Sequence, residues 1–96
     1  MQIAEIQVQA RELRLAQGWT STDPAERLAY LMTEVGEVAR EVLDMRQDGS
    51  DAEARERLGM EIYDVVWNLC DLANLFDVDL EPAFEKKVAI NRARTW

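Results

Sequence analysis

Apolar residues recur along this chain at intervals of three and four positions, the spacing of one buried face on an amphipathic helix. The first such segment covers about residues 2–17, with Ile3, Ile6, Ala10 and Leu13 on one side, and it stops at Gly18. We find no sustained alternation of period two, hairpin turn signal, low-complexity tract or internal repeat. The pattern therefore predicts an all-α fold, in one domain covering residues 1–96, with four helices joined by short links.

Capping signals mark the starts of the other three helices. An acid, a proline and a glutamate at the third helical position begin the second helix at residues 23–26, and Gly49 ends it after about residue 48. Ser50 and Glu53 form a capping box that opens the third helix, which lasts until about residue 76. The fourth helix covers about residues 80–94. We expect the two long central helices to pack antiparallel.

The two long helices each carry an apolar side that we expect to face the core. These positions are Leu28, Leu31, Val35, Val38, Ala39 and Val42 in the second helix, and Leu58, Ile62, Val65, Leu69, Leu72 and Phe76 in the third. The third helix also carries Tyr63, Val66, Trp67 and Cys70 on its far side. Because a helix that is apolar on two sides is buried on two sides, we expect Trp67 to lie in a subunit interface.

Composition narrows the possible functions. The chain has 19 Asp and Glu against 11 Lys and Arg, a net charge of −8, and no histidine. A protein that tracks nucleic-acid phosphates needs the opposite charge, so we expect no nucleic-acid polymer as partner. The absence of histidine excludes His-based acid–base catalysis, Ser-His and Cys-His pairs and imidazole zinc sites. Carboxylate chemistry remains.

The chain shows no feature of a membrane or secreted protein. Its N-terminus lacks a basic stretch followed by an apolar one, and no apolar run approaches the roughly 18 residues that a membrane span needs. The single cysteine, Cys70, lies in an apolar stretch and is expected to be a buried small hydrophobe. We expect a cytoplasmic protein without a membrane partner.

Two acidic motifs are the most informative feature. Glu34 and Glu37 lie three apart on the second helix, and Glu61 and Asp64 lie three apart on the third. Side chains three apart are neighbours on a helix, so an antiparallel pair can bring four carboxylates to one place. Oxygen ligands without His or Cys suit Mg²⁺ or Mn²⁺. The alternative is a solvated acidic face, but these acids border the apolar stripes instead of lying opposite them.

Two further features bear on ligand binding. Gly36, within the first acidic motif, costs about 1 kcal/mol relative to alanine in a helix, which suggests a close approach by a helix or a ligand. Basic residues gather in the last eleven positions, at Lys86, Lys87, Arg92 and Arg94. They can hold phosphate oxygens, or simply complement the helix dipole. Lys87 and Asn91, four apart, are the better candidates for ligand contact.

These residues resemble a known family. The segments 31–39 (Leu-Met-Thr-Glu-Val-Gly-Glu-Val-Ala), 61–67 (Glu-Ile-Tyr-Asp-Val-Val-Trp) and the tail 79–92 are similar to the MazG-like nucleotide pyrophosphohydrolases, of the all-α NTP pyrophosphatase superfamily. The resemblance covers roughly residues 19–96. It implies a four-helix bundle completed as a homodimer or homotetramer. Many members have one more acid where this chain has Thr33, which suggests one of the shorter subfamilies.

The resemblance also implies a reaction. Glu34, Glu37, Glu61 and Asp64 would bind Mg²⁺, and a (deoxy)nucleoside triphosphate would be hydrolysed to the monophosphate and pyrophosphate, a reaction that would suit nucleotide-pool house-cleaning. The metal neutralises the triphosphate and activates water for in-line attack. We favour Glu37 over Glu34 as the catalytic base, although the sequence does not separate them.

Other residues are candidates for substrate contact. The resemblance matches Lys87 and Asn91, and less closely Arg94, to nucleotide-facing positions. Trp19, in the link before the second helix, is expected to stack on a base or to cover the helix start. Asn68, one turn after Asp64, is expected to contact a sugar or base edge, or to be a plain surface amide. Two other functions remain: hydrolysis of phosphoribosyl-ATP, and a non-catalytic helical interaction module with Trp67 and Tyr63 as its anchor.

Overall fold

The structure, a computed structural model, describes residues 1–46 and 51–96. These residues form four helices: α1 (Ile3–Gln17), α2 (Pro24–Met45), α3 (Ala52–Leu75) and α4 (Leu80–Ala93). No strand occurs in the described part of the chain. The predicted all-α class and the order of four helices are therefore confirmed.

The helices begin where their capping residues predict, with one exception. Asp23 caps α2 by accepting a hydrogen bond from the amide of Ala25, and a proline follows it at the first helical position. The cap of α3 is Asp51, which accepts from the amides of Glu53 and Ala54, so α3 starts one residue later than a cap at Ser50 would place it. The predicted end of the second helix at residues 48–49 and the cap at Ser50 lie outside the described residues.

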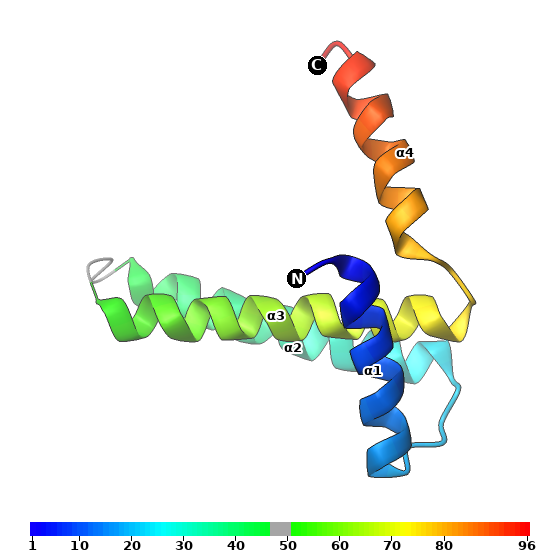
Figure 1. Cartoon of the computed structure of the whole chain (residues 1–96). Helices are drawn as coiled ribbons and strands as arrows, with labels where there is room; N and C mark the ends of the chain where they lie inside the picture. Colours follow the sequence, from blue (N-terminus) through cyan, green and yellow to red (C-terminus); the bar gives the residue numbers. More distant parts are fainter. Residues whose placement is uncertain (47–50) are drawn as a thin grey trace.

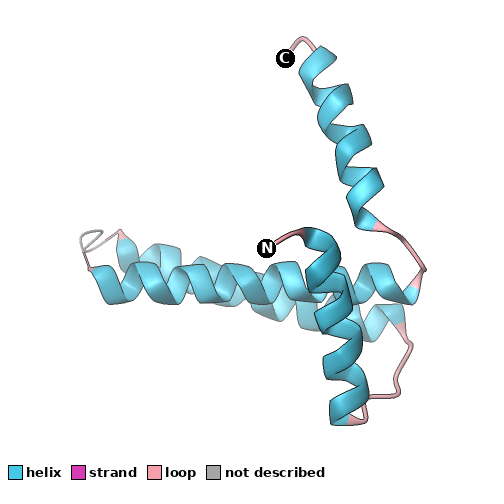
Figure 2. Ribbon diagram, in the orientation of Figure 1, coloured by secondary structure: helices cyan, strands magenta, loops and turns pink. Residues whose placement is uncertain are grey.

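Helices α2 and α3 form a long antiparallel pair, as predicted, and α1 lies across α3 (Figure 1). Helix α4 projects away from this pair, so that the chain is extended and not spherical (Figure 2). Its radius of gyration is 15.7 Å, against about 12–13 Å for a compact domain of this length.

A clamp of side-chain amides fixes α4 at its base. Gln7 of α1 is buried, and its amide nitrogen donates to Asn74 and to the carbonyl of Val78. Its side-chain oxygen accepts from the backbone amide of Leu80, the first residue of α4. Beyond this joint, no residue of α4 is buried.

The predicted apolar faces of the long helices point outward in this chain, which corrects the core prediction. Of the six predicted core positions in α2 only Leu31 is buried, and in α3 Ile62, Leu69 and Phe76 are exposed. The buried side of α3 carries Asn68, Cys70, Asp71 and Ala73 instead. The reason is that α1 packs against the far side of α3, while α2 packs against the polar stripe of α3 formed by Glu61, Asp64, Asn68 and Asp71. Cys70 is buried, as predicted.

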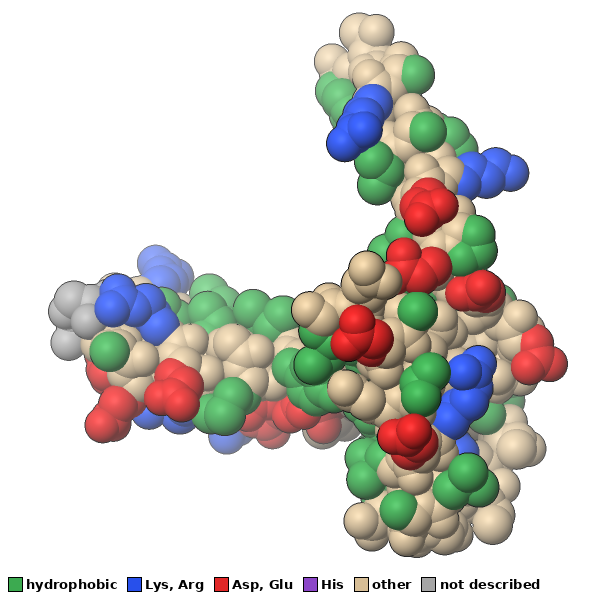
Figure 3. Space-filling model, viewed as in Figure 1, with side chains coloured by type: hydrophobic (Ala, Val, Ile, Leu, Met, Phe, Trp, Pro, Cys, Tyr) green, Lys and Arg blue, Asp and Glu red, His purple; other side chains and the backbone are tan. Residues whose placement is uncertain are grey.

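The outward apolar faces leave an unusually large surface. The chain exposes 7052 Å², whereas a compact monomer of its mass would expose roughly 5,600 Å². Apolar side chains run along the α2–α3 pair and along α4 in the space-filling view (Figure 3). The exposed apolar residues of the chain include Val35, Leu69, Phe76, Phe84 and Val88. In residues 1–46 and 51–96, no helix is long and apolar enough to cross a membrane.

Candidate active site

Three of the four predicted metal ligands come together between α2 and α3. Carboxylate oxygens of Glu34, Glu61 and Asp64 all lie within 4.8 Å of one another, and each of the three side chains is half-buried. The fourth predicted ligand, Glu37, lies next to them on α2 but does not join this three-residue group. The antiparallel pairing of two helices, each with acids three apart, produces this cluster.

The carboxylates of the cluster repel one another. Burial raises the pKa of Glu34, and the charges of Asp64, Glu61 and Glu37 raise it further. Burial likewise raises the pKa of Glu61, followed by the charges of Asp64, Glu37 and Glu41. Like charges that cannot separate favour the protonated form. A hard divalent cation would relieve that repulsion, and an all-oxygen donor set suits Mg²⁺ or Mn²⁺.

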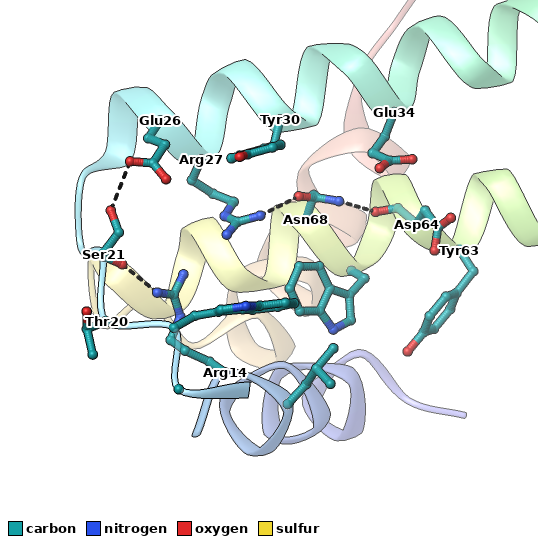
Figure 4. A pocket seen from close by; sticks show the side chains of 14 residues that line it. Arg14, Thr20, Ser21, Glu26, Arg27, Tyr30, Glu34, Tyr63, Asp64 and Asn68 are labelled. Atoms are coloured by element: carbon teal, nitrogen blue, oxygen red, sulfur yellow. Dashed lines mark hydrogen bonds between the residues drawn. The ribbon is translucent and has the colours of Figure 1, made fainter. Parts of the chain in front are cut away.

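The acidic cluster forms one end of a cavity. Glu34 and Asp64 line an open cavity of about 750 Å³, together with residues of α1, the 18–23 link, α2 and α3 (Figure 4). This volume is in the range of small-molecule sites. The cavity walls also include Trp19, Tyr30 and Trp67, so it has an acidic end and an aromatic side.

The aromatic residues contact one another and a cation. Trp19 meets Trp67 edge to face, with ring centroids 6.3 Å apart. The guanidinium carbon of Arg27 lies 5.4 Å from the ring centroid of Tyr30 and 5.5 Å from that of Trp67. Within the single chain Trp67 lines the cavity wall, and its predicted place in a subunit interface stays a prediction. The far side of α3 is covered by α1 and by the link that carries Trp19.

Asn68 is buried in the cavity wall and is not the surface amide that we considered. Only 5% of it is exposed. Its side-chain oxygen accepts from Nη1 of Arg27 at 2.9 Å, and its Nδ2 donates to the carbonyl of Asp64 at 2.8 Å. Asn68 thus joins the arginine to the helical turn that presents one of the clustered acids.

An ion triad of buried Asp71 and half-buried Arg14 and Arg27 supports this wall. Asp71 accepts from Nε and Nη2 of Arg14, at 3.1 and 2.6 Å. Its Oδ2 also lies 2.7 Å from Nε of Arg27, in an ion pair whose angle is too bent for a hydrogen bond. Sequence reasoning missed both arginines. Arg27 is seven residues before Glu34, so it shares a helix face with that acid, which is the signal that could have identified it.

The predicted substrate residues of α4 do not reach the cluster within this chain. Lys87 and Asn91 lie on the projecting helix, and Arg94 stacks against the ring of Trp96 at 4.1 Å. Gly36 also lacks the expected close neighbour, because a Cβ built on it meets no atom within 4 Å. The close approach that Gly36 suggested is absent from the single chain.

A family model and two known relatives match this chain. Residues 22–94 match the family model of the MazG nucleotide pyrophosphohydrolase domain. The chain is 34% identical over 89 residues to the uncharacterized protein YvdC of Bacillus subtilis (strain 168), covering 84% of each chain. It is 36% identical over 73 residues to the dATP/dGTP diphosphohydrolase of Cyanophage S-2L, covering 76% of this chain and 58% of that relative. No solved structure matches.

Proposed function

This chain belongs to the MazG nucleotide pyrophosphohydrolase family, and from that premise we propose that it hydrolyses (deoxy)nucleoside triphosphates to monophosphates and pyrophosphate, with Mg²⁺ as cofactor. The observation that carries the proposal is a cavity with clustered carboxylates at one end and aromatic rings along its side. A nucleoside triphosphate has a part for each: its triphosphate would meet the acidic end through the cation, and its flat base would meet the aromatic side. The name of the cyanophage relative, which refers to dATP and dGTP, supports a deoxynucleotide substrate.

The acidic cluster fits the proposed cation. Glu34, Glu61 and Asp64 offer oxygens close enough to share one ion, and Glu37 is near enough to join or to act beside it. When bound, Mg²⁺, or Mn²⁺ in its place, would offset the triphosphate charge and make water a stronger nucleophile. Glu37 is our candidate for the base that takes the proton of the attacking water. Because Glu37 is outside the group of three, its carboxylate is the freest for that task.

The aromatic side of the cavity would bind the nucleoside. Trp19, in the link before α2, offers a ring face of the kind that stacks on a base. Asn68 would lie beside the sugar or base, although its hydrogen bonds to Arg27 and Asp64 use part of its capacity. We assign it to shaping the cavity wall next to the sugar.

A second copy of the chain would complete the site. The exposed surface exceeds that of a compact monomer by about 1,400 Å², more than the roughly 800 Å² that each partner buries in a standard interface. We propose that the outward apolar faces of α2, α3 and α4 pair in a homodimer or homotetramer. In this assembly Lys87 and Asn91 would lie over the acidic cluster of another copy and contact the phosphates.

The test is release of pyrophosphate from a panel of nucleoside triphosphates, with Mg²⁺ and with EDTA. We expect pyrophosphate and the monophosphate as products, only with the metal, and loss of turnover in Glu37→Gln and Asp64→Asn. Glu12→Gln is the matched control, since it makes the same change on an exposed position of α1. Release of phosphate without pyrophosphate would contradict the proposed bond cleavage. Turnover of phosphoribosyl-ATP alone would assign a different substrate, and no turnover despite bound Mg²⁺ would favour an interaction module.

A further inference from the structure

Asp71 lies outside the cavity but contacts two residues of its wall. It is only 1% exposed and does not line the cavity, whereas Arg14 and Arg27 do. The two arginines come from α1 and α2, and both reach the same carboxylate on α3. Asp71 is therefore the point where three helices meet behind the proposed nucleoside site.

Arg14, one of the two arginines of the triad, contacts the link that carries Trp19. Arg14 binds Asp71 through Nε and Nη2, and its remaining nitrogen, Nη1, donates to the carbonyl of Ser21 (Figure 4). Ser21 in turn donates from its hydroxyl to Glu26 on α2. The link between α1 and α2 is exposed throughout, and these polar contacts hold it against the wall together with the backbone hydrogen bond from Trp19 to Arg14 and the ring contact of Trp19.

Arg27, the other arginine, contacts aromatic rings of the cavity wall. Arg27 is oriented by Asp71 on one side and by Asn68 on the other, and its guanidinium lies against Tyr30 and Trp67. Both arginines thus connect Asp71 to the aromatic residues, and Trp19 and Trp67 contact each other. A shift of the Asp71 carboxylate would free both arginines to move.

Energetics favour a positioning role over a stabilising one. Removing charges from water costs several kcal/mol per ion, so replacing a buried ion triad by apolar side chains is often neutral or stabilising. In some proteins such buried polar groups are kept for the geometry that they impose. This chain buries few apolar side chains, several of them alanines, so packing alone would leave the rings of Trp19 and Tyr30 poorly fixed.

We propose that Asp71 is a positioning residue that sets affinity for the nucleoside part of the substrate by fixing Trp19 and Trp67 through the two arginines. This inference rests on the proposed function. It places the determinant of base binding one layer behind the cavity, in a residue that does not contact substrate.

Three variants test it: Asp71→Asn, the apolar triple Arg14→Met/Asp71→Leu/Arg27→Met, and the matched control Arg55→Met. Arg55 is exposed near the start of α3 and does not line the cavity. The triple variant keeps the test valid if Asp71→Asn fails to fold. Binding is measured by quenching of tryptophan fluorescence with α,β-methylene nucleoside triphosphates, which does not require turnover. Turnover, inhibition by inorganic triphosphate and Mn²⁺ affinity are measured beside it.

We expect the folded variants to bind the nucleotide roughly tenfold more weakly, and their KM to rise roughly tenfold, which corresponds to the loss of about one aromatic contact. The turnover number, the inhibition constant of inorganic triphosphate and Mn²⁺ affinity should stay within about twofold of wild type, because they depend on the acidic end. Unchanged nucleotide affinity in the folded triple variant would overturn the inference, as would equal losses for nucleotide and inorganic triphosphate. A wild-type chain that binds the analogue without hydrolysing nucleotides would contradict the proposed function and leave this comparison valid.

Discussion

The substitution Glu34→Gln should reverse its effect on stability when metal is added. Without metal, Glu34 is held beside Asp64 and Glu61, with oxygens within 4.8 Å, and its pKa is raised by burial and by these charges. Glutamine has the same shape without the charge, so it removes the repulsion. With metal, the same change removes a ligand.

The structure sets the size of both effects. Two charges at this separation repel by about 1 kcal/mol when water screens them, and this lower value applies because Glu34 is only half-buried. Metal-free Glu34→Gln should thus be more stable by about 1 kcal/mol, a rise in Tm of roughly 4–8 °C for a chain of this length. Free Mg²⁺ at about 100 times its Kd adds about 2.7 kcal/mol to wild type and much less to the variant.

The pH dependence has a definite sign. A raised pKa means that the folded chain binds a proton at Glu34 more tightly than the unfolded chain does. This contribution to the stability of metal-free protein is complete below the ordinary value of 4.5 and is lost as pH rises through the raised pKa of the folded chain. Glu34→Gln should remove it.

Thermal unfolding with EDTA and with Mg²⁺, at several pH values, measures all of these effects. Glu12→Gln, the same change on an exposed position of α1, should shift Tm little in either condition. A metal-free Glu34→Gln chain that is less stable than wild type would refute the assumption that the acids repel one another. Equal stabilisation of both chains by Mg²⁺ would refute the ligand role of Glu34.

Three other predictions concern the assembly and the core. Co-expressed Glu61→Gln and Lys87→Ala chains should regain activity that neither variant has alone. In a mixed oligomer, the intact acids of the Lys87→Ala chain would meet the intact Lys87 of the Glu61→Gln chain. If the mixed oligomer is as inactive as each variant, both residues belong to the site of one chain. Gly36→Ala should stabilise a lone chain by about 1 kcal/mol, so a lower Tm with dissociation on a sizing column would instead reveal a partner packed there. Cys70 should react with a thiol reagent only on unfolding, because burial both blocks it and raises its pKa; fast labelling of native protein would contradict the packing of α1 on α3.

Local signals in the sequence were sufficient for the helices. The cap at Asp23 and the proline after it determine where α2 starts, whatever surrounds them. Glu34, Glu61 and Asp64 meet because residues three apart are neighbours on a helix and the two helices run antiparallel. Which side of α3 is buried could not be read in the same way. It depends on where α1 docks, and α3 has two apolar sides from which the sequence alone does not choose.

The cavity wall was harder to predict for a related reason. Arg14, Arg27 and Asp71 are far apart in sequence and meet only after three helices have packed. In a sequence, each reads as an ordinary charged residue on a helix. Aromatic residues are common in both interfaces and ligand sites, so the sequence alone does not place Trp67 on the cavity wall, where it contacts Trp19 and Arg27.

The outward apolar faces and the acidic cluster are two consequences of one arrangement. To bring Glu34, Glu61 and Asp64 together, α2 and α3 must turn their polar stripes toward each other. Apolar positions that border those stripes, such as Val35 and Ile62, then lie on the outside. A chain built this way leaves apolar side chains exposed, and we therefore expect the proposed metal site to come with a partner subunit as well as a cation. A design that buried those faces within one chain would have to separate the acids.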